Sequence, residues 1–314
     1  MTRYIIRRLL LAIPVMLLVA VTTFLLLHMT PGDPVSVLLG PDATVEQIDQ
    51  MREALGLNDP VHVQLLNWFR NLAHGDLGES IFLDKPVTEA IAERAQPTLL
   101  LTFLASLVAI CVGLPFGVIS AVRRGSTIDI GAMLVAMVGI SMPTFWLGLN
   151  LIFIFGVKLR WLPVQGYQPL SEGLWTSLRY LIMPALTLGA AQGALLARMT
   201  RSMMLEVLHE DYVRTARAKG VSERRVILRH ALRNAFIPLV TVIGLTFAVL
   251  ISGAVVTEQV FGIPGAGQLL IRAVNRRDFP LIQGIVLIVA LLYVIINLIV
   301  DLIYVFLDPR IHYS

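Results

Sequence analysis

The chain has 314 residues, of which 56% are hydrophobic and 15% are charged, and its mean hydropathy is +0.77. Soluble globular domains contain about 45–50% apolar and about 25% charged residues, so this composition excludes a disordered or coiled-coil protein and indicates a membrane protein. The net charge is +4 and the isoelectric point is near 9.5, which is also typical of nucleic-acid-binding proteins. The single cysteine, Cys111, excludes a disulfide framework.

Six apolar runs are long enough to cross a bilayer, which takes about 20 mostly apolar residues. They are residues 9–27, 98–122, 130–157, 180–197, 236–257 and 284–307, the last interrupted only by Asp301. Pro143 lies inside the third run and predicts a kink or break there. The first run exceeds the apolar stretch of about 7–15 residues of a signal peptide and lacks a cleavage site, so we expect a retained membrane anchor.

The basic residues are unevenly distributed, and their distribution predicts the orientation of the chain. With the N-terminus in the cytoplasm, the inner segments hold 15 of the 25 lysines and arginines, nine of them within 198–234. The outer segment 31–97 holds four basic and eleven acidic residues, a net charge of −7. Because this pattern follows the positive-inside rule, both termini are expected inside, and the basic balance is a topology signal that argues against nucleic-acid binding.

The outer segment 31–97 carries helix-start signals. Thr44 and Gln47 form a capping-box pattern before an amphipathic helix. Residues 59–60, Asp-Pro, predict the N-cap and first residue of a second helix running to about Leu72. We expect these two short helices to lie against the outer face of the membrane.

Three other outer segments are dominated by turn formers. Residues 74–80 favour packing and turn formation over a chemical role. Segment 158–179 contains a Trp-Leu-Pro sequence of the kind that anchors a span at the membrane interface. The Gly- and Pro-rich part of 258–283 either anchors a span at the membrane interface or instead lines an entrance or touches a partner.

The cytoplasmic segment 198–234 is the most informative part of the sequence. Helix-forming residues run over 202–219, Gly220 is placed to end that helix, and Ser222 is placed to cap a second one. The pattern predicts a helix–glycine–helix elbow at residues 211–225.

The predicted surface of the elbow suits a protein partner. Small side chains at Thr215, Ala216 and Ala218 would let the groove of another protein approach closely, and the neighbouring arginines and lysine would pair with acidic rims. An amphipathic inner loop whose arginines only set the topology is the alternative interpretation.

Residues 211–220, DYVRTARAKG, together with 230–235 and Pro238, closely resemble the coupling-loop signature of ATP-binding-cassette importer permeases, and more narrowly the dipeptide/oligopeptide/nickel branch. Other segments that carry the resemblance run nearly end to end along the chain: 31–34, 75–78, 141–143, 161–163, 183–185, 198–201, 277–280 and 308–310. Residues 214–216, Arg-Thr-Ala, stand where the broad importer motif has Glu-Ala-Ala, and this variant resembles the same branch.

The resemblance implies an all-α polytopic membrane protein with the type I importer-permease fold and six transmembrane helices, located in the bacterial cytoplasmic (inner) membrane. It implies four parts: 1–30 with the first span, the extracytoplasmic helical loop 31–97, the permease core 98–307 including the coupling loop 198–234, and the cytoplasmic tail 308–314. The implied partners are a second homologous permease, two cytoplasmic ATPase subunits and an extracytoplasmic substrate-binding protein.

The resemblance also implies a transport subunit that is not an enzyme, has no metal or cofactor of its own, and works with ATP and Mg²⁺ bound by the partner ATPases. The residues agree independently, because the only lysines, Lys85, Lys158 and Lys219, lie outside any phosphate-binding GxxxxGK[ST] loop.

The candidate site residues fall into three sets. The candidate ATPase-coupling residues are Asp211, Tyr212, Arg214, Thr215, Ala216, Arg217, Lys219, Gly220, Ser222, His230, Arg233 and Asn234. Polar side chains within the spans that either line a pathway or form helix–helix hydrogen bonds are Asn150, Gln192 and Asn297. The candidate contacts for a binding protein are Phe261, Pro264, Gly265, Arg276, Arg277 and Asp278.

The expected function is ATP-driven import by alternating access, in which closure of the ATPase pair moves the elbow. Small residues in 188–194 and 252–254 would let the helices slide. The expected cargo is a di- or oligopeptide, with glutathione, opines and nickel chelates as alternatives. One rival class is an ion-driven secondary transporter. The lack of an internal repeat, and of acidic residues within the spans other than Asp301, disfavours it. The other rival class is a membrane sensor or anchor.

Overall fold

The computed structural model describes residues 2–307, with side chains for 6–303. The predicted tail 308–314 lies outside the described residues, including the part that carries the resemblance at 308–310. The chain divides into two compact units, unit 1 (Met1–Gln96 with Pro264–Ile295) and unit 2 (Pro97–Ile263 with Ile296–Ser314). Two long helices, α5 (Val87–Val122) and α13 (Phe279–Leu307), each contribute residues to both units.

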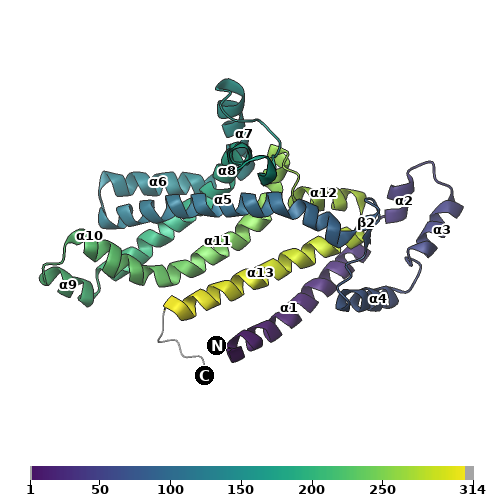
Figure 1. Cartoon of the computed structure of the whole chain (residues 1–314), viewed down its shortest axis with the longest axis horizontal. Helices are drawn as coiled ribbons and strands as arrows, with labels where there is room; N and C mark the ends of the chain where they lie inside the picture. The colour runs from purple at the N-terminus through teal and green to yellow at the C-terminus, as the bar shows by residue number, and fades with distance from the viewer. Residues whose placement is uncertain (1, 308–314) are drawn as a thin grey trace. The chain divides into compact units, whose positions relative to one another are not determined.

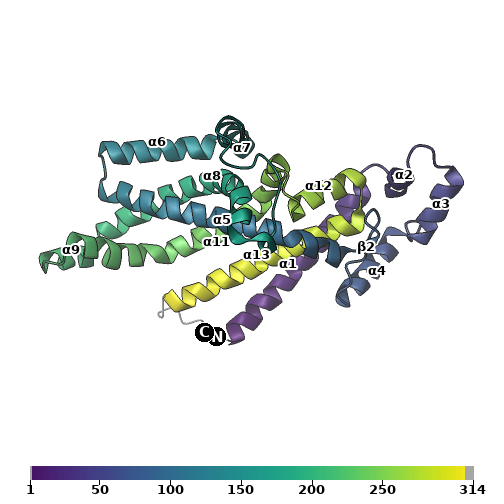
Figure 2. The same cartoon turned by 45° about the horizontal axis from the view of Figure 1, so that its top comes forward.

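Unit 1 is built from short helices around a small apolar core. Its other elements are α1 (Thr2–Met29), α2 (Pro34–Leu39), α3 (Val45–Ala54), α4 (Val61–Ala73), the antiparallel strands β1 (Glu79–Ser80) and β2 (Lys85–Pro86), and α12 (Ala266–Arg276). Helix α1 runs beside the first half of α13 in both views (Figures 1 and 2). The core joins Val87 and Ile91 of α5 to Leu269 of α12 and Leu281 of α13.

The helix-start signals of unit 1 are largely confirmed. Gln47 N donates to Thr44 Oγ1 at 3.3 Å and Thr44 N donates to Gln47 Oε1 at 2.9 Å, which completes the predicted capping box of α3. Helix α4 begins one residue later than predicted, because Pro60 occupies its N-cap. Helix α2 was not predicted, and the Asp33 side chain caps it by accepting from Ser36 N at 3.1 Å.

Unit 2 is a bundle of long helices with the elbow at one end. Besides the second half of α5, it contains α6 (Thr127–Ser141), α7 (Thr144–Leu151), the π-helix η1 (Ile152–Lys158), the 3₁₀ turn η2 (Leu170–Glu172), α8 (Leu174–Leu208), α9 (Asp211–Ala218), α10 (Glu223–Arg225), the π-helix η3 (Val226–Ala231) and α11 (Leu232–Phe261). Figures 1 and 2 both show α9 and α10 at the same end of α8 and α11. Fully buried Leu101, Leu181, Leu250 and Phe261 form part of the main core.

Within the described residues, five helices are long and apolar enough to span a membrane, or six spans exist if one bent pair counts as a span. That pair, Thr127–Ser141 and Thr144–Lys158, corresponds to the run 130–157 that we predicted as one kinked span, and its halves meet at 102°. The physical reason is Pro143, which offers no backbone N–H and holds Met142 in an extended conformation (ψ 125°).

Helices α5 and α8 approach through glycines. A Cβ added to Gly189 would lie 2.6 Å from the carbonyl oxygen of Ala105, and one added to Gly117 would lie 2.6 Å from that of Ala197. The small-residue run 188–194 therefore lies at a close helix contact, as the sequence predicted, because only glycine admits backbone at this distance.

Candidate coupling site and membrane core

The elbow begins where α8 ends. Helix α8 runs through Leu208, and the chain then turns at 209–210 before α9 begins at Asp211. The prediction of a single helix over 202–219 is therefore wrong. The turn brings Val213 of α9 against Leu208 of α8, so the burial of these apolar side chains explains the break.

Gly220 ends α9 as predicted. It has a φ of +76°, and its N–H donates to the Arg217 carbonyl at 2.9 Å while Val221 N–H donates to the Ala216 carbonyl at 3.2 Å. This pair of bonds is the Schellman arrangement, which satisfies the last carbonyls of a helix and needs a left-handed residue. The sequence therefore sets the angle at which the chain leaves α9.

The elbow has an apolar core of its own. Val213 and Val226 are fully buried and Ala216 is 8% exposed, and Val207 and Val221 pack against them. This placement corrects the expectation that Ala216 offers a low surface to a partner, because its methyl group faces the interior of the elbow. Ala216 positions α9, and a larger side chain there would push α9 away from Val226.

Two polar contacts close the elbow. Asn234 Nδ2 donates to the Tyr212 hydroxyl at 2.9 Å and to the His230 carbonyl at 2.8 Å, which joins α9 to α11. Arg217 donates to both carboxylate oxygens of Glu223, at 2.7 and 3.2 Å. The hydrogen bond that Arg217 donates to Glu223 raises the pKa of the Arg217 guanidinium against the opposing effect of burial, so this exposed pair stays charged.

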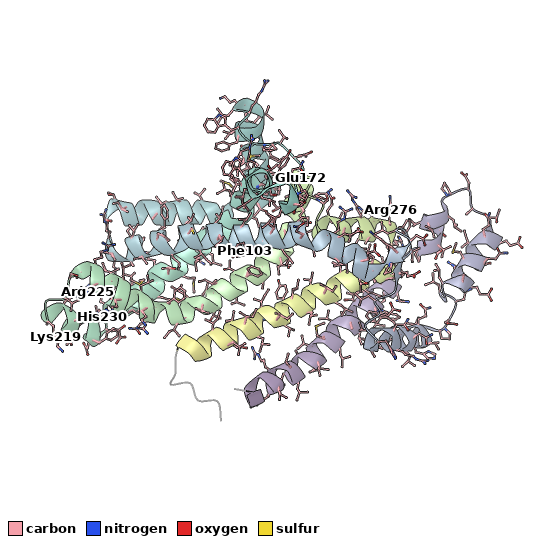
Figure 3. The ribbon with its side chains drawn as sticks, viewed as in Figure 1. Phe103, Glu172, Lys219, Arg225, His230 and Arg276 are labelled. Carbon is pink, nitrogen blue, oxygen red and sulfur yellow. The ribbon has the colours of Figure 1, made fainter. Side chains whose placement is uncertain are left out.

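The second arm of the elbow is one long helix. Residues Glu223–Phe261 form a continuous 39-residue helical segment that includes α10, η3 and α11. The Ser222 side chain makes no capping hydrogen bond, which corrects the predicted cap; the Ser222 carbonyl instead accepts from Arg225 N at 2.8 Å. Figure 3 places Lys219, Arg225 and His230 together at this end of unit 2.

The outward surface of the elbow is basic. Tyr212 is 42% exposed, and the other exposed candidate residues of the elbow are Asp211, Arg214, Thr215, Arg217, Lys219, Gly220 and Ser222. Arg233, on the following helix, is also exposed, whereas His230 is half-buried. The only acid of α9, Asp211, lies 3.4 Å from Arg214 in a contact open to solvent. Such a surface can receive an acidic groove of another protein.

A buried ion pair that the sequence interpretation missed ties α6 to α8. Asp129 is 3% exposed and accepts from Arg201 Nε at 2.7 Å and from Arg201 Nη2 at 2.8 Å. Ser120 Oγ of α5 and Gly125 N also donate to Asp129. This cluster, the Asp129 clamp, lies seven residues before the end of α8, about 10 Å from the elbow along the helix.

A second buried carboxylate lies near the other end of the bundle. Glu258 is fully buried in α11, and Thr98 Oγ1 of α5 donates to its Oε1 at 2.5 Å. The sequence interpretation began the third span at residue 130, just after Asp129, and ended the fifth at Thr257, just before Glu258, so both acids were counted as loop residues. The helices extend past those limits and bury both, which no local pattern indicated.

The candidate pathway residues lie on three helices. Asn150 on α7 is half-buried and donates to the Trp146 carbonyl at 2.7 Å, one turn earlier in the helix. Gln192 on α8 is half-buried, and Asn297 on α13 is exposed. Their role as pathway residues stays a prediction.

The candidate contacts for a binding protein are mostly buried. Phe261 is 2% exposed within the core of unit 2, Gly265 is buried, and Asp278 is 1% exposed in unit 1. Asp278 accepts from Ser80 Oγ at 2.5 Å and from Leu281 N at 3.3 Å, so it joins the strand pair to the start of α13.

Of the remaining residues in that set, Arg277 donates to the Pro31 carbonyl, Pro264 is half-buried, and Arg276 is exposed. Phe261, Gly265 and Asp278 are therefore withdrawn as surface contacts, and Arg276 is the exposed member. Within residues 2–307, no group of three or more His, Cys, Asp or Glu side chains is arranged to hold a metal ion.

The long apolar helices define a multi-pass helical membrane protein, and the elbow is an exposed part of it. The chain belongs to the family of binding-protein-dependent transport system inner membrane components, whose family model matches residues 113–313, while the model of the N-terminal part of that family matches residues 1–102. It is therefore a permease subunit of an ATP-binding-cassette importer and a multi-pass inner-membrane protein, as the resemblance implied.

Named relatives match over the whole chain. A protein of Brucella suis biovar 1 (strain 1330), provisionally named a peptide transport system permease protein, is 48% identical over 314 residues, all of both chains. The glutathione transport system permease protein GsiC of Salmonella choleraesuis (strain SC-B67) is 45% identical over the same coverage. A solved structure of the MetNI methionine ABC transporter shares the fold, with a TM-score of 0.58 and 20% identity over 70% of this chain and 96% of that one.

Proposed function

We propose that this permease forms half of the translocation pathway of an importer for di- or oligopeptides, driven by two partner ATPase subunits that dock on the elbow. A second homologous permease supplies the other half, and an extracytoplasmic binding protein delivers the cargo. ATP and Mg²⁺ bind to the ATPases, and both termini of this chain lie in the cytoplasm. Alternating access follows from movement of the elbow against the bundle.

The preformed elbow is the observation that carries this proposal. Its own apolar core, the Schellman turn at Gly220 and the Tyr212–Asn234 bond hold α9 in one shape. A docked partner therefore meets a small rigid body whose displacement is passed to α8 and α11. The nine basic residues of 198–234 support a cytoplasmic location for it.

The Asp129 clamp supports a route from the elbow into the bundle. It joins α6 and the end of α5 to α8 close to the elbow, so these three helices are tied to one another where a displacement would arrive. The buried pair leaves little freedom for α8 to move without α6.

Charge reversal on the elbow tests the proposal. In the complete transporter, reconstituted in nanodiscs, Arg214→Glu with Lys219→Glu should remove ATPase binding and peptide uptake while the permease still inserts and melts normally. Lys158→Glu with Arg70→Glu, an equal charge change at two exposed residues outside the elbow, is the matched control and should transport normally. Normal uptake by the elbow variant would contradict the proposal.

The names of two relatives bear on the cargo. Peptide transport is favoured by the name of the Brucella suis relative, and the Salmonella GsiC relative makes glutathione the second candidate. Mass spectrometry of the ligand that co-purifies with the cognate binding protein separates the two.

An ion-driven transporter is the rival for the energy source. It would need titratable groups in the spans, and Asp129 is engaged with Arg201. Uptake that survives ATP depletion would support that rival.

A further inference from the structure

A cavity of about 120 Å³ in unit 1 has a cationic lining. It lies where the turn between β1 and β2, the first turns of α5 and one face of α12 meet. Its charged lining residues are Lys85, Arg94, Arg272, Arg276, Glu93 and Asp278. A cavity of this volume has room for a carboxylate group.

The two acids of the cavity are already engaged. Lys85 Nζ lies 2.5 Å from Glu93 Oε2. Asp278 is buried beneath the cavity, where Ser80 and Leu281 N donate to it. Neither carboxylate is therefore available to neutralise the arginines of α12.

The direct contacts of the two arginines of α12 are with neutral groups. Arg272 Nη2 donates to Gln268 Oε1 at 2.9 Å, and the Arg276 guanidinium lies 5.5 Å from the centre of the Phe82 ring. Among the residues with described side chains, neither forms an ion pair with a carboxylate. The two are four residues apart and share one face of α12, so their like charges repel each other.

The positive charge of this cavity contrasts with the acidic segment next to it. The segment 31–97 that provides one wall has eleven acidic and four basic residues. The arginines are therefore not part of a generally basic surface, which would attract any anion. Two guanidinium groups that line one cavity, beside an aromatic ring and an amide, suit a carboxylate, because their planar donors match its two oxygens.

The geometry points to a docking pocket in which Arg272 and Arg276 receive the carboxylate of one aspartate or glutamate side chain of the extracytoplasmic binding protein. This inference rests on the proposed function, since it gives that partner a specific anchor. The family to which the chain belongs depends on a binding protein, so a soluble protein partner is favoured over an anionic lipid.

Association of the cargo-loaded binding protein with the complete transporter in nanodiscs tests the pocket. We compare wild type, Arg272→Gln with Arg276→Gln, and Arg70→Gln, which removes an exposed arginine of α4 outside the cavity. The double variant should raise the Kd about tenfold and flatten its dependence on salt, whereas Arg70→Gln should leave both nearly unchanged. The lysine pair Arg272→Lys with Arg276→Lys should recover part of the affinity.

The possible failures are distinguishable. If wild type associates with the binding protein and the glutamine variant does so with the same Kd and salt dependence, the pocket is overturned while the proposed function stands. If wild type itself shows no association, the proposed function fails. An unchanged Kd together with reduced retention of phosphatidylglycerol by the purified double variant would assign the cavity to lipid and overturn the inference. The melting temperature of the double variant should equal that of wild type, which shows that the variant is folded.

Discussion

Arg201→Gln should destabilise the permease more than any substitution of an exposed arginine. The substitution removes the guanidinium that faces both oxygens of Asp129, at 2.7 and 2.8 Å, and leaves that carboxylate 3% exposed. Ser120 and Gly125 still donate to it, but they supply no compensating charge. The folded state then contains a buried, uncompensated anion, which is costly in a low-dielectric interior.

The magnitude follows from the burial of each partner. Breaking a buried ion pair by removing one member costs about 3–5 kcal/mol. The Arg201 side chain is 26% exposed, so we expect the lower end, about 3 kcal/mol. Asp129→Asn should cost less, because the Arg201 guanidinium left behind can reach solvent. The double variant should be more stable than Arg201→Gln alone, since no buried charge is left unpaired.

Thermal unfolding of the purified permease in detergent measures the stability of each variant. Wild type should be the most stable, followed by Asp129→Asn, and Arg201→Gln should be the least stable. The double variant should be more stable than Arg201→Gln. Arg217→Gln is the matched control, because its bond to Glu223 is also 2.7 Å long but the side chains are 41% and 55% exposed. A surface pair of this kind contributes about 0–1 kcal/mol. Equal losses for Arg201→Gln and Arg217→Gln, or strictly additive effects in the double variant, would refute the reasoning.

Three other substitutions should change the melting temperature for local reasons. Gly117→Ala places a methyl group 2.6 Å from the Ala197 carbonyl oxygen and should separate α5 from α8, whereas Gly131→Ala, with no atom within 4 Å, should be neutral or stabilising in the same assay. Gly220→Ala should cost about 1–2 kcal/mol through its positive φ alone, and an unchanged melting temperature would contradict the Schellman turn. Thr44→Ala should cost about 0.5–2 kcal/mol by removing the capping box, with loss of protection of the α3 amides in hydrogen exchange as the readout.

The sequence predicted features that depend on neighbouring residues. The capping box at Thr44 and the helix end at Gly220 each involve groups within about one helical turn, so composition and spacing contain the information. The apolar runs located the spans for the same reason, since length and hydropathy are local properties.

Features that depend on distant residues were missed. Asp129 and Arg201 lie 72 positions apart, and their pairing follows only from the packing of α6 on α8. The inward orientation of Ala216 depends on Val226, which the chain brings back only after the Gly220 turn. Pro143 predicted a break, but the angle of 102° is set by what each half packs against.

The 39-residue helical segment Glu223–Phe261 should not bend evenly, because two irregularities, the π-helix η3 and Pro238, fall in its first 16 residues. Bending is therefore concentrated in these 16 residues, about 24 Å of helix next to the elbow, and the remaining 23 residues form a stiff rod of about 35 Å. A swing of about 10° at Pro238 would displace the far end, at Phe261, by about 6 Å. Small rearrangements at the elbow are thus converted into movements at the opposite end that are as large as a side chain.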